Sequence, residues 1–465
     1  MLGKYVVNDR NQDKRWKYSI MKQYEQDMTQ GSLWKQIWKY SLPLMFTNVL
    51  QVVFNLADIA VAGQFAGAGA LGSVGSTTIL VTLFTGLLIG LAGGVNVLVA
   101  HARGEKNSEK TAATVHTAAI ITLLAGVAVA IFGILFARPM LTAMRTKPEL
   151  LDGAVLYFQI YFLGMPALAL YNYGNAVLSA VGDTKRPLYY LSFSGVLNVL
   201  LNLLFVIVFH MSVAGVALAS AISQCVSAAL LLRTLLRSTG DYGLCLKKLK
   251  ISGEIAGNLL KLGIPSAIQY AIFQFANLFV QMGVNSFDTV VVEGTAAAAN
   301  ADGIVYEMMA AFYTAGATFI GQNFGAGKKD RILKSYFIST FYAMILAMIL
   351  GGALLLGGRF FLAVFTSDPA VIEAGMYRLT VMGMSYWVSA FMDSAIAASR
   401  GMGHTSVPTV IVIMGSCVFR LFWIYTVFAF FGTITSLYLL YVCSWTITAI
   451  AETWYFVKIY KRMKQ

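Results

Sequence analysis

Charged residues, cysteine and proline are all scarce in this sequence. Asp, Glu, Lys and Arg make up 12% of the 465 residues, against roughly 25% in an average soluble domain. Hydrophobic residues make up 58%, more than a soluble protein of this length could bury without exposing large apolar patches. The composition excludes a disordered chain and a basic nucleic-acid-binding domain. We therefore predict an integral membrane protein that has no nucleic-acid partner.

The four cysteines and four histidines show no metal-binding spacing. None of the cysteines lies in a CxxC motif, and three of them fall within apolar runs, where cysteine acts as a small hydrophobic residue. We therefore expect no disulfide framework and no resident cofactor. The first residues are basic and lack an early apolar run, so we also expect no cleavable signal peptide.

Twelve apolar stretches are long enough to cross a membrane, since crossing the hydrocarbon core takes about 20 residues as a helix. The pattern predicts an all-α membrane protein with twelve transmembrane helices. The predicted spans are 40–62, 75–99, 113–136, 154–177, 187–209, 213–235, 258–284, 296–320, 334–357, 372–398, 407–430 and 434–456.

The 34 Lys and Arg residues fall almost entirely on one side of this arrangement. The positive-inside rule then places both termini in the cytoplasm, and we expect a multi-pass protein of the inner (cytoplasmic) cell membrane. The predicted organisation is a cytoplasmic basic segment 1–39, a six-helix bundle 40–236, a cytoplasmic connecting loop 237–257, a second six-helix bundle 258–456 and a cytoplasmic tail 457–465.

The two bundles repeat each other at an offset of 221 or 222 residues. Lys39–Pro43 matches Lys261–Pro265, and Gly182–Pro187 matches Gly403–Pro408. A repeat of six helices keeps the same orientation in the membrane, so the halves are related by a pseudo-two-fold axis along the membrane normal. Two such bundles around a central cavity are typical of an alternating-access transporter. A channel would not need two halves that rock.

Polar side chains in the first bundle converge at one depth. Asp58, Asn202 and Ser220 all lie roughly 20–24 Å from the inner boundary, with Asn198 one turn away from Asn202. Carboxylate, amide and hydroxyl oxygens suit hard cations, and a carboxylate also binds a proton. We predict that Asp58, Asn198, Asn202 and Ser220 form a cation-coupling site for H⁺ or Na⁺.

The second bundle is a natural comparison for this site. At the repeat offset, Asp58 corresponds to Val280, and the two asparagines correspond to Phe419 and Trp423. The polar set is therefore not required by every six-helix unit. Two other interpretations remain open: an interfacial carboxylate that reaches the outer surface, and amides that only hold helices together.

A second group of charges, Glu307, Asp393 and Arg420, lies within the spans of the second bundle. Arginine stays protonated, so Arg420 is expected to need a counter-charge. The group is either a static ion pair that fixes packing or a gate or second protonation site. A cavity for flat organic cations is predicted from the remaining polar and aromatic candidates: Gln51, Asn55, Asn172, Asn175, Tyr173, Gln274, Tyr306 and Trp387.

Several motifs resemble the multidrug and toxic compound extrusion (MATE) family. They are Gln51–Asp58, Gly182–Pro187, the GQNFGAGK stretch at Gly321–Lys328, and Arg400–Gly403. The resemblance implies a secondary antiporter that expels organic, usually cationic or amphipathic, solutes in exchange for Na⁺ or H⁺.

Within that family the pattern is similar to the DinF-like branch. The matching positions are Asp58, Asn172, Asn175, Asn198 and Ser220. Asn202 departs, because relatives that bind Na⁺ often have Asp there, and this leaves H⁺ coupling open.

Taken together, these features predict a non-enzymatic antiporter whose partners are small organic substrates and membrane lipid, and which we expect to be a monomer. The alternative is a flippase for lipid-linked precursors from the same superfamily. That function would be expected to require a more strongly cationic cavity than Arg420 alone supplies.

Overall fold

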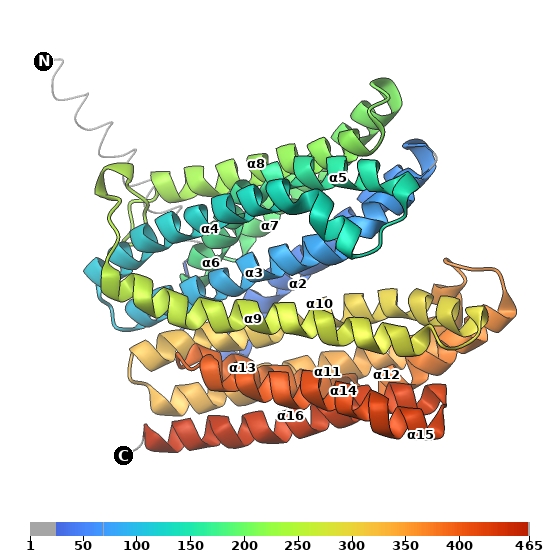
Figure 1. Ribbon diagram of the computed structural model, residues 1–465. Helices are drawn as coiled ribbons and strands as arrows, with labels where there is room; N and C mark the ends of the chain where they lie inside the picture. Colours follow the sequence, from blue (N-terminus) through green and yellow to red (C-terminus); the bar gives the residue numbers. More distant parts are fainter. Residues whose placement is uncertain (1–24, 68, 464–465) are drawn as a thin grey trace, which may run out of the picture.

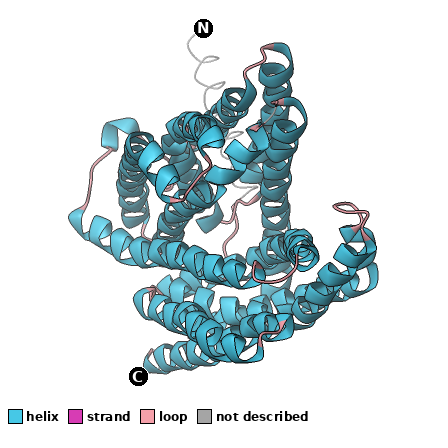
Figure 2. Cartoon of the chain, turned by 45° about the vertical axis from the view of Figure 1, so that its right-hand side comes forward, coloured by secondary structure: helices cyan, strands magenta, loops and turns pink. Residues whose placement is uncertain are grey.

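The computed structural model describes residues 25–67 and 69–463, and all regular structure in this part of the chain is helical (Figures 1 and 2). Residues 1–24 of the predicted basic N-terminal segment lie outside the described part.

Twelve membrane-crossing units account for the helices, six in each half of the chain. Those of the first half are α2 (Leu33–Phe65), α3 (Ala70–Gly104), α4 (Ser108–Ala143), the pair α5 (Pro148–Leu163) and α6 (Met165–Ala180), α7 (Lys185–Leu203) with a π-helical turn at Leu204–Val208, and α8 (Ser212–Arg237).

The second half begins after a short 3₁₀ turn at Leu246–Lys248. Its units are α9 (Gly253–Val284), α10 (Thr289–Gly325), α11 (Lys329–Leu362), α12 (Pro369–Gly401), the interrupted helix formed by α13 (Ser406–Val412), α14 (Phe419–Trp423) and α15 (Ala429–Phe431), and α16 (Ile434–Arg462). Two π-helical turns, Ile413–Val418 and Ile424–Phe428, join the pieces of the interrupted helix.

By length and composition alone, eight described helices are apolar enough to cross a membrane, and a ninth unit is the bent pair α5–α6. The other three units, α9, α10 and α12, have 32, 37 and 33 residues. They are long enough to cross, since a membrane-spanning helix needs about 20 residues, but they are more polar. The predicted twelve-helix fold is confirmed, and the helices continue beyond the apolar runs from which they were predicted.

The fourth crossing is a sharply bent pair of helices. Its two pieces meet at Gly164 and bend by 45°, just before Pro166, which has no backbone N–H to donate. A Cβ atom at Gly164 would lie 2.3 Å from the side-chain oxygen of Gln224 on α8, so a larger residue there would require the Gln224 side chain to move. The predicted span 154–177 is therefore one crossing made of two helices.

The helices lie side by side and end at two opposite faces (Figure 1). The basic face, as we call it, carries the turns 104–108, 180–185, 237–253, 325–329 and 401–406, together with the start of α2 and the end of α16. The opposite face carries the turns 65–70, 143–148, 208–212, 284–289, 362–369 and 431–434.

In Figure 1 the first half of the chain lies above the second half. The halves meet where α3 crosses α9, and this crossing depends on glycine. A Cβ atom at Gly90 of α3 would lie 2.5 Å from the backbone nitrogen of Ala267, and one at Gly94 would lie 3.1 Å from that of Gly263. The absence of side chains therefore lets the two backbones approach closely.

Contacts between the halves become closer toward the basic face. A Cβ atom at Gly104 would lie 2.0 Å from the carbonyl oxygen of Gln322, and one at Gly325 would lie 2.1 Å from that of His101. Among the described residues, every hydrogen bond between the halves lies between the basic face and the bond from Asn48 to the Glu307 carbonyl (2.9 Å). The molecule is thus closed at its basic face.

Helix α2 belongs to both halves. Leu33 and Ile37, near its start, are buried in a core with Met309 and Phe312 of α10. Further along, the helix packs against α7 and α8 of the first half. This course places Asp58, near the other end of α2, beside α7 and α8.

Candidate functional site

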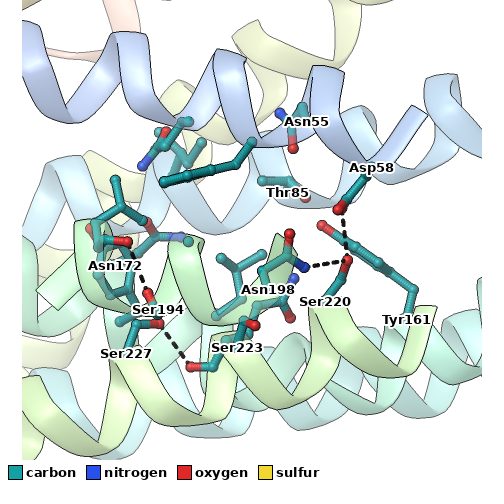
Figure 3. Close-up of a pocket in the computed structure, with 18 residues that line it drawn as sticks. Asn55, Asp58, Thr85, Tyr161, Asn172, Ser194, Asn198, Ser220, Ser223 and Ser227 are labelled. Atoms are coloured by element: carbon teal, nitrogen blue, oxygen red, sulfur yellow. Dashed lines mark hydrogen bonds between the residues drawn. The ribbon is translucent and has the colours of Figure 1, made fainter. Parts of the chain in front are cut away.

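Asp58 accepts hydrogen bonds at both carboxylate oxygens. Asn202 Nδ2 donates to Asp58 Oδ1 over 2.5 Å, and Ser220 Oγ donates to Oδ2 over 2.8 Å. Asn198 completes the group: its Nδ2 donates to Ser220 Oγ, and its Oδ1 accepts from Asn202, both over 3.3 Å. The four residues predicted as the cation-coupling site are therefore brought together, from α2, α7 and α8. Figure 3 shows three of them, Asp58, Asn198 and Ser220.

Helix geometry explains this convergence. Asn198 and Asn202 are one turn apart on α7, so their side chains share a face. Asn202 comes just before the π-helical turn Leu204–Val208; such turns are frequent at functional sites. Asn198, Asn202 and Ser220 are 6%, 0% and 5% exposed. They lie on the α7 and α8 side of the carboxylate.

No basic side chain pairs with Asp58 in the described part of the chain. A desolvated charge without a partner costs several kcal/mol even after the surroundings relax. Neutral donors compensate only part of this cost. The site is therefore chemically suited to take up a proton or a small cation.

A cavity of about 180 Å³, with many polar residues in its lining, lies next to the carboxylate. It has room for several water molecules, at about 30 Å³ each, but it is smaller than the roughly 300 Å³ or more of typical drug-sized sites. Thr85 Oγ1, Asn172 Nδ2 and Ser223 Oγ, from residues that line it, are buried without a hydrogen-bond partner. The size and the free polar atoms fit an ion with its water.

The predicted residues Gln51, Asn55 and Asn172 also line this cavity. Tyr161 lines the cavity as well and lies beside Asp58 in Figure 3. Sequence reasoning missed Ser223 and Ser227, two members of a polar stripe on α8. Ser220, Ser223, Gln224 and Ser227 all line the cavity, and their spacing of three and four residues was the signal that could have revealed this stripe.

Two predicted cavity residues lie elsewhere in the first half. Tyr173 is fully buried and donates its hydroxyl to the Val115 carbonyl over 3.0 Å, so its prediction as a cavity residue was wrong. Asn175 is not among the cavity-lining residues and accepts from Ser179 on its own helix over 3.3 Å. Both take part in helix packing, because α6 presents Leu168, Tyr171 and Asn172 to the cavity instead.

The predicted cavity residues of the second half do not reach this pocket either. Tyr306 packs edge-on against Tyr386 and Trp445. Trp387 is 43% exposed and donates to the Met384 carbonyl of its own helix over 2.9 Å. Gln274 on α9 is partly buried. A role for these three residues in solute binding stays a prediction.

The ion pair predicted among Glu307, Asp393 and Arg420 is wrong, whereas their role as a gate or second protonation site stays a prediction. Within the described chain Arg420 forms no ion pair; its guanidinium donates to Asn277 Oδ1 over 2.9 Å and to Ser444 Oγ over 3.3 Å. It also lies over the rings of Phe273 and Tyr441, at 4.9 and 4.7 Å. Aromatic faces attract a desolvated cation by about 2 kcal/mol or more, and so replace the expected counter-charge.

The two acids of that predicted network lie apart from Arg420. Asp393 accepts from Ser389 one turn earlier on α12 over 3.2 Å, and Glu307 receives the Asn48 bond at its backbone carbonyl.

Among the described residues, the buried ion pair of the second bundle is instead Arg378–Asp302; the pair Arg359–Glu373 is exposed. Arg378 Nη2 and Nε donate to Asp302 Oδ2 over 2.7 and 3.1 Å, and Tyr386 donates to Oδ1. Arg378 and Asp302 are 6% and 4% exposed. Sequence reasoning did not pair them, because they lie on different helices with no shared motif.

Breaking this pair is expected to destabilise the fold. Asp302→Asn leaves Arg378 buried without a counter-charge, which costs about 3–5 kcal/mol. We expect a clearly lower midpoint of thermal unfolding in detergent. The double variant Asp302→Leu with Arg378→Met is the control and should recover most of the loss, because a buried pair replaced by apolar residues is often neutral. An equal fall of the unfolding midpoint in Asp302→Asn and in the double variant would contradict a stabilising role for the ion pair.

The hydroxyl of Ser220 is expected to set the ion affinity of the site. In Ser220→Ala, Asp58 loses a hydrogen bond worth about 1.5–3 kcal/mol. A proton should then bind more tightly, because the ionised carboxylate is less stabilised, whereas Na⁺ should bind more weakly. Half-maximal ion concentrations for transport measure this change. Ser223→Ala, on the same helix without a bond to Asp58, is the matched control; equal shifts in both variants would contradict the assignment.

A family model described as MatE matches this chain twice, at residues 43–204 and 265–426. The two matches fall in the two halves and reproduce the internal repeat.

Three relatives among curated proteins are named as transporters or resistance proteins. A probable multidrug resistance protein, YpnP of Bacillus subtilis, is 28% identical over 79% of this chain and 81% of its own length. The FAD transporter of Shewanella oneidensis is 22% identical over 74% of this chain and 77% of its own length. The multidrug export protein MepA of Staphylococcus aureus is 20% identical (80% and 83% coverage).

Solved structures share the fold at low sequence identity. One, described as the outward-facing conformation of a multidrug resistance MATE family transporter, has a TM-score of 0.88 at 19% identity and covers 94% of this chain and 98% of its own. A transporter of the MOP superfamily from Pyrococcus furiosus has the same TM-score and coverage at 20% identity. With the repeated helical halves and the two family matches, these findings establish that the chain belongs to the MatE family of multidrug and toxic compound extrusion transporters.

Proposed function

We propose that this protein is a secondary antiporter that exports organic compounds, cationic or amphipathic, in exchange for H⁺ or Na⁺. The observation that carries the proposal is Asp58: a partly buried carboxylate with neutral donors, no basic partner among the described residues, and a small cavity with many polar lining residues beside it. Family membership supports multidrug efflux as the general activity. The ion and the exchange mechanism are our inference from the site.

We further propose that the basic face is cytoplasmic, with both termini on that side. Lys and Arg gather in its turns, as the positive-inside rule requires of cytoplasmic segments. The conformation closed at that face is then the one that releases solute outside. The opposite conformation, open at the basic face, would take solute from the cytoplasm.

Ion binding drives export only if the ion binds the two conformations with different affinity. In our proposal, an external ion enters at Asp58 in the outward-open state and lowers the affinity for the solute. The solute leaves, and the ion-loaded protein returns to release its ion inside. The coupling is reciprocal, so the solute must weaken ion binding by the same factor.

Reciprocity gives the test of the proposal. The affinity of the purified protein for ethidium is measured by fluorescence polarisation. It should fall as the concentration of one of the two ions, Na⁺ or H⁺, is raised. The same ion should lose its effect in Asp58→Asn. Ethidium binding that is indifferent to both ions would overturn the antiport mechanism. Binding that weakens equally in the wild type and in Asp58→Asn would move the ion site elsewhere.

A second substrate class is supported by Arg420. This guanidinium is 1% exposed and has an Nη2 without a hydrogen-bond partner, which favours solutes that carry an anionic group, in line with the relative named as an FAD transporter. Competition of FAD with ethidium that is lost in Arg420→Gln would support this class. The flippase alternative is less favoured, since none of the described residues that line the cavity beside Asp58 is Lys or Arg.

A further inference from the structure

The residues just before α2 cross the basic face from one half of the molecule to the other. We call residues 25–31 the strap. On the second half, the Met28 amide donates to Gln322 Oε1 over 3.1 Å, and the Met28 carbonyl accepts from Asn323 Nδ2 over 3.1 Å. Arg331 adds bonds to the carbonyls of Met28, Gln30 and Gly31 over 3.0–3.1 Å.

The strap is also bonded to the first half. The Gln26 amide donates to the Val181 carbonyl over 3.1 Å, and Glu25 pairs with Arg103 over 3.1 Å. The backbone of Gly182, with φ +98°, lies against Gln26: a Cβ atom there would be 2.7 Å from the Gln26 nitrogen. A glycine is therefore required for this close approach.

The middle of the strap is anchored in the protein interior. Met28 is fully buried and Thr29 is 4% exposed, and Met28 packs in the same core as the first turns of α2. Asp27 folds the strap locally, since the Thr29 amide and hydroxyl donate to it over 2.8 and 2.6 Å. Partial burial raises the pKa of Asp27, but these bonds and the charges of Lys106 and Lys328 lower it further, so the pKa lies below its ordinary value.

Gln322 joins all three parts. Its Oε1 accepts from the strap, and its Nε2 donates to the Ala180 carbonyl of the first half over 2.7 Å. Gln322 itself lies on α10 of the second half and is 3% exposed. Separating the halves at the basic face therefore breaks bonds of Gln322 and detaches the strap from at least one half.

We propose that the strap is a latch that stabilises the conformation closed at the basic face. The inference rests on the proposed alternating-access function, because only a transporter that opens this face must release the latch. The strap runs directly into α2, and Asp58 lies roughly 38 Å along that helix from Leu33. One continuous element thus connects the ion site with the latch.

The test compares two truncations in a variant whose four cysteines are replaced by serine. Removing residues 1–31 deletes the strap, whereas removing residues 1–24 keeps it and serves as the matched control. Spin labels at Glu109 and Asp330 report the separation of the halves at the basic face, and labels at Lys147 and Ser367 report it at the opposite face. Distances are measured by pulsed electron spin resonance in lipid nanodiscs.

Full-length variants cover the case in which truncation impairs folding. Arg331→Ala removes the three bonds to strap carbonyls, and Lys334→Ala, an exposed residue on the same helix, is its charge-matched control. Because three hydrogen bonds at the lower end of their usual net strength correspond to about a factor of ten, the ratio of closed to open molecules should fall at least tenfold. We expect longer basic-face distances together with shorter opposite-face distances in the strap variants only.

Unchanged distances in both strap variants would overturn the latch, and so would longer distances at both faces, which indicate general loosening. Failure of the proposed function looks different. If basic-face and opposite-face distances never change in opposite directions, whatever the pH, Na⁺ concentration or ethidium added to the wild type, alternating access itself is wrong.

Discussion

Asp58→Asn is expected to abolish ion-driven export of ethidium from everted membrane vesicles while leaving the protein folded. Asparagine has nearly the same shape as aspartate, so the packing around Asn202 and Ser220 is kept. It cannot bind a proton at neutral pH and offers Na⁺ no charge. Asp58 is the only carboxylate among the lining residues of the cavity, so no other group there can take over.

The matched control is Asp152→Asn, the same change at a carboxylate that is 82% exposed near the opposite face. It should export at the wild-type rate. The two proteins should also elute alike in size-exclusion chromatography and unfold at similar temperatures. Ethidium export by Asp58→Asn at the wild-type rate would remove Asp58 from the coupling mechanism.

Gly90→Val is expected to prevent closure of the basic face and thereby stop transport. The new Cβ would lie 2.5 Å from the Ala267 nitrogen, and a backbone atom cannot move aside as a flexible side chain can. Forcing extra carbon into packed contacts costs about 1–3 kcal/mol, enough to favour the opposite conformation by a factor of roughly ten to one hundred. Gly93→Val is the control, because no atom lies within 4 Å of that Cβ position.

The conformational shift is measured by labelling a cysteine placed at Thr318 in the cysteine-free protein. Thr318 is fully buried and bonds to Asn96 of the other half over 2.9 Å, so a water-soluble maleimide reaches it only when the basic face opens. Labelling should become much faster in Gly90→Val and stay slow in Gly93→Val. Slow labelling in both, with normal export, would contradict the role of the α3–α9 crossing in closure.

The fold was largely predictable from sequence because lipid imposes a simple rule: an apolar run of sufficient length must be a helix that satisfies its own backbone. The apolar runs do not indicate where a helix bends or how far it extends beyond the run. The break at Gly164 falls inside one continuous apolar stretch. The extra turns at the helix ends are polar, so hydrophobicity does not reveal them.

The site was predictable in part, and there is a physical reason why some residues were placed correctly and others were not. Depth follows from counting residues, so Asp58, Asn198, Asn202 and Ser220 could be placed at one level. Rotation about the helix axis does not follow from counting. For that reason Tyr173 was wrongly assigned to the cavity, and Arg420 was paired with acids rather than with the Asn277 amide and two aromatic rings.

Ion movement in proteoliposomes is the most direct test of the claim that a carboxylate in the first half energises export. With ethidium loaded inside and no other gradient, release of the dye through wild-type protein oriented to export it should draw H⁺ or Na⁺ inward, as recorded by a trapped pH dye or Na⁺ indicator. Vesicles with Asp58→Asn should show no such uptake. Dye release with equal ion uptake in both proteins, or with none in the wild type, would contradict the account.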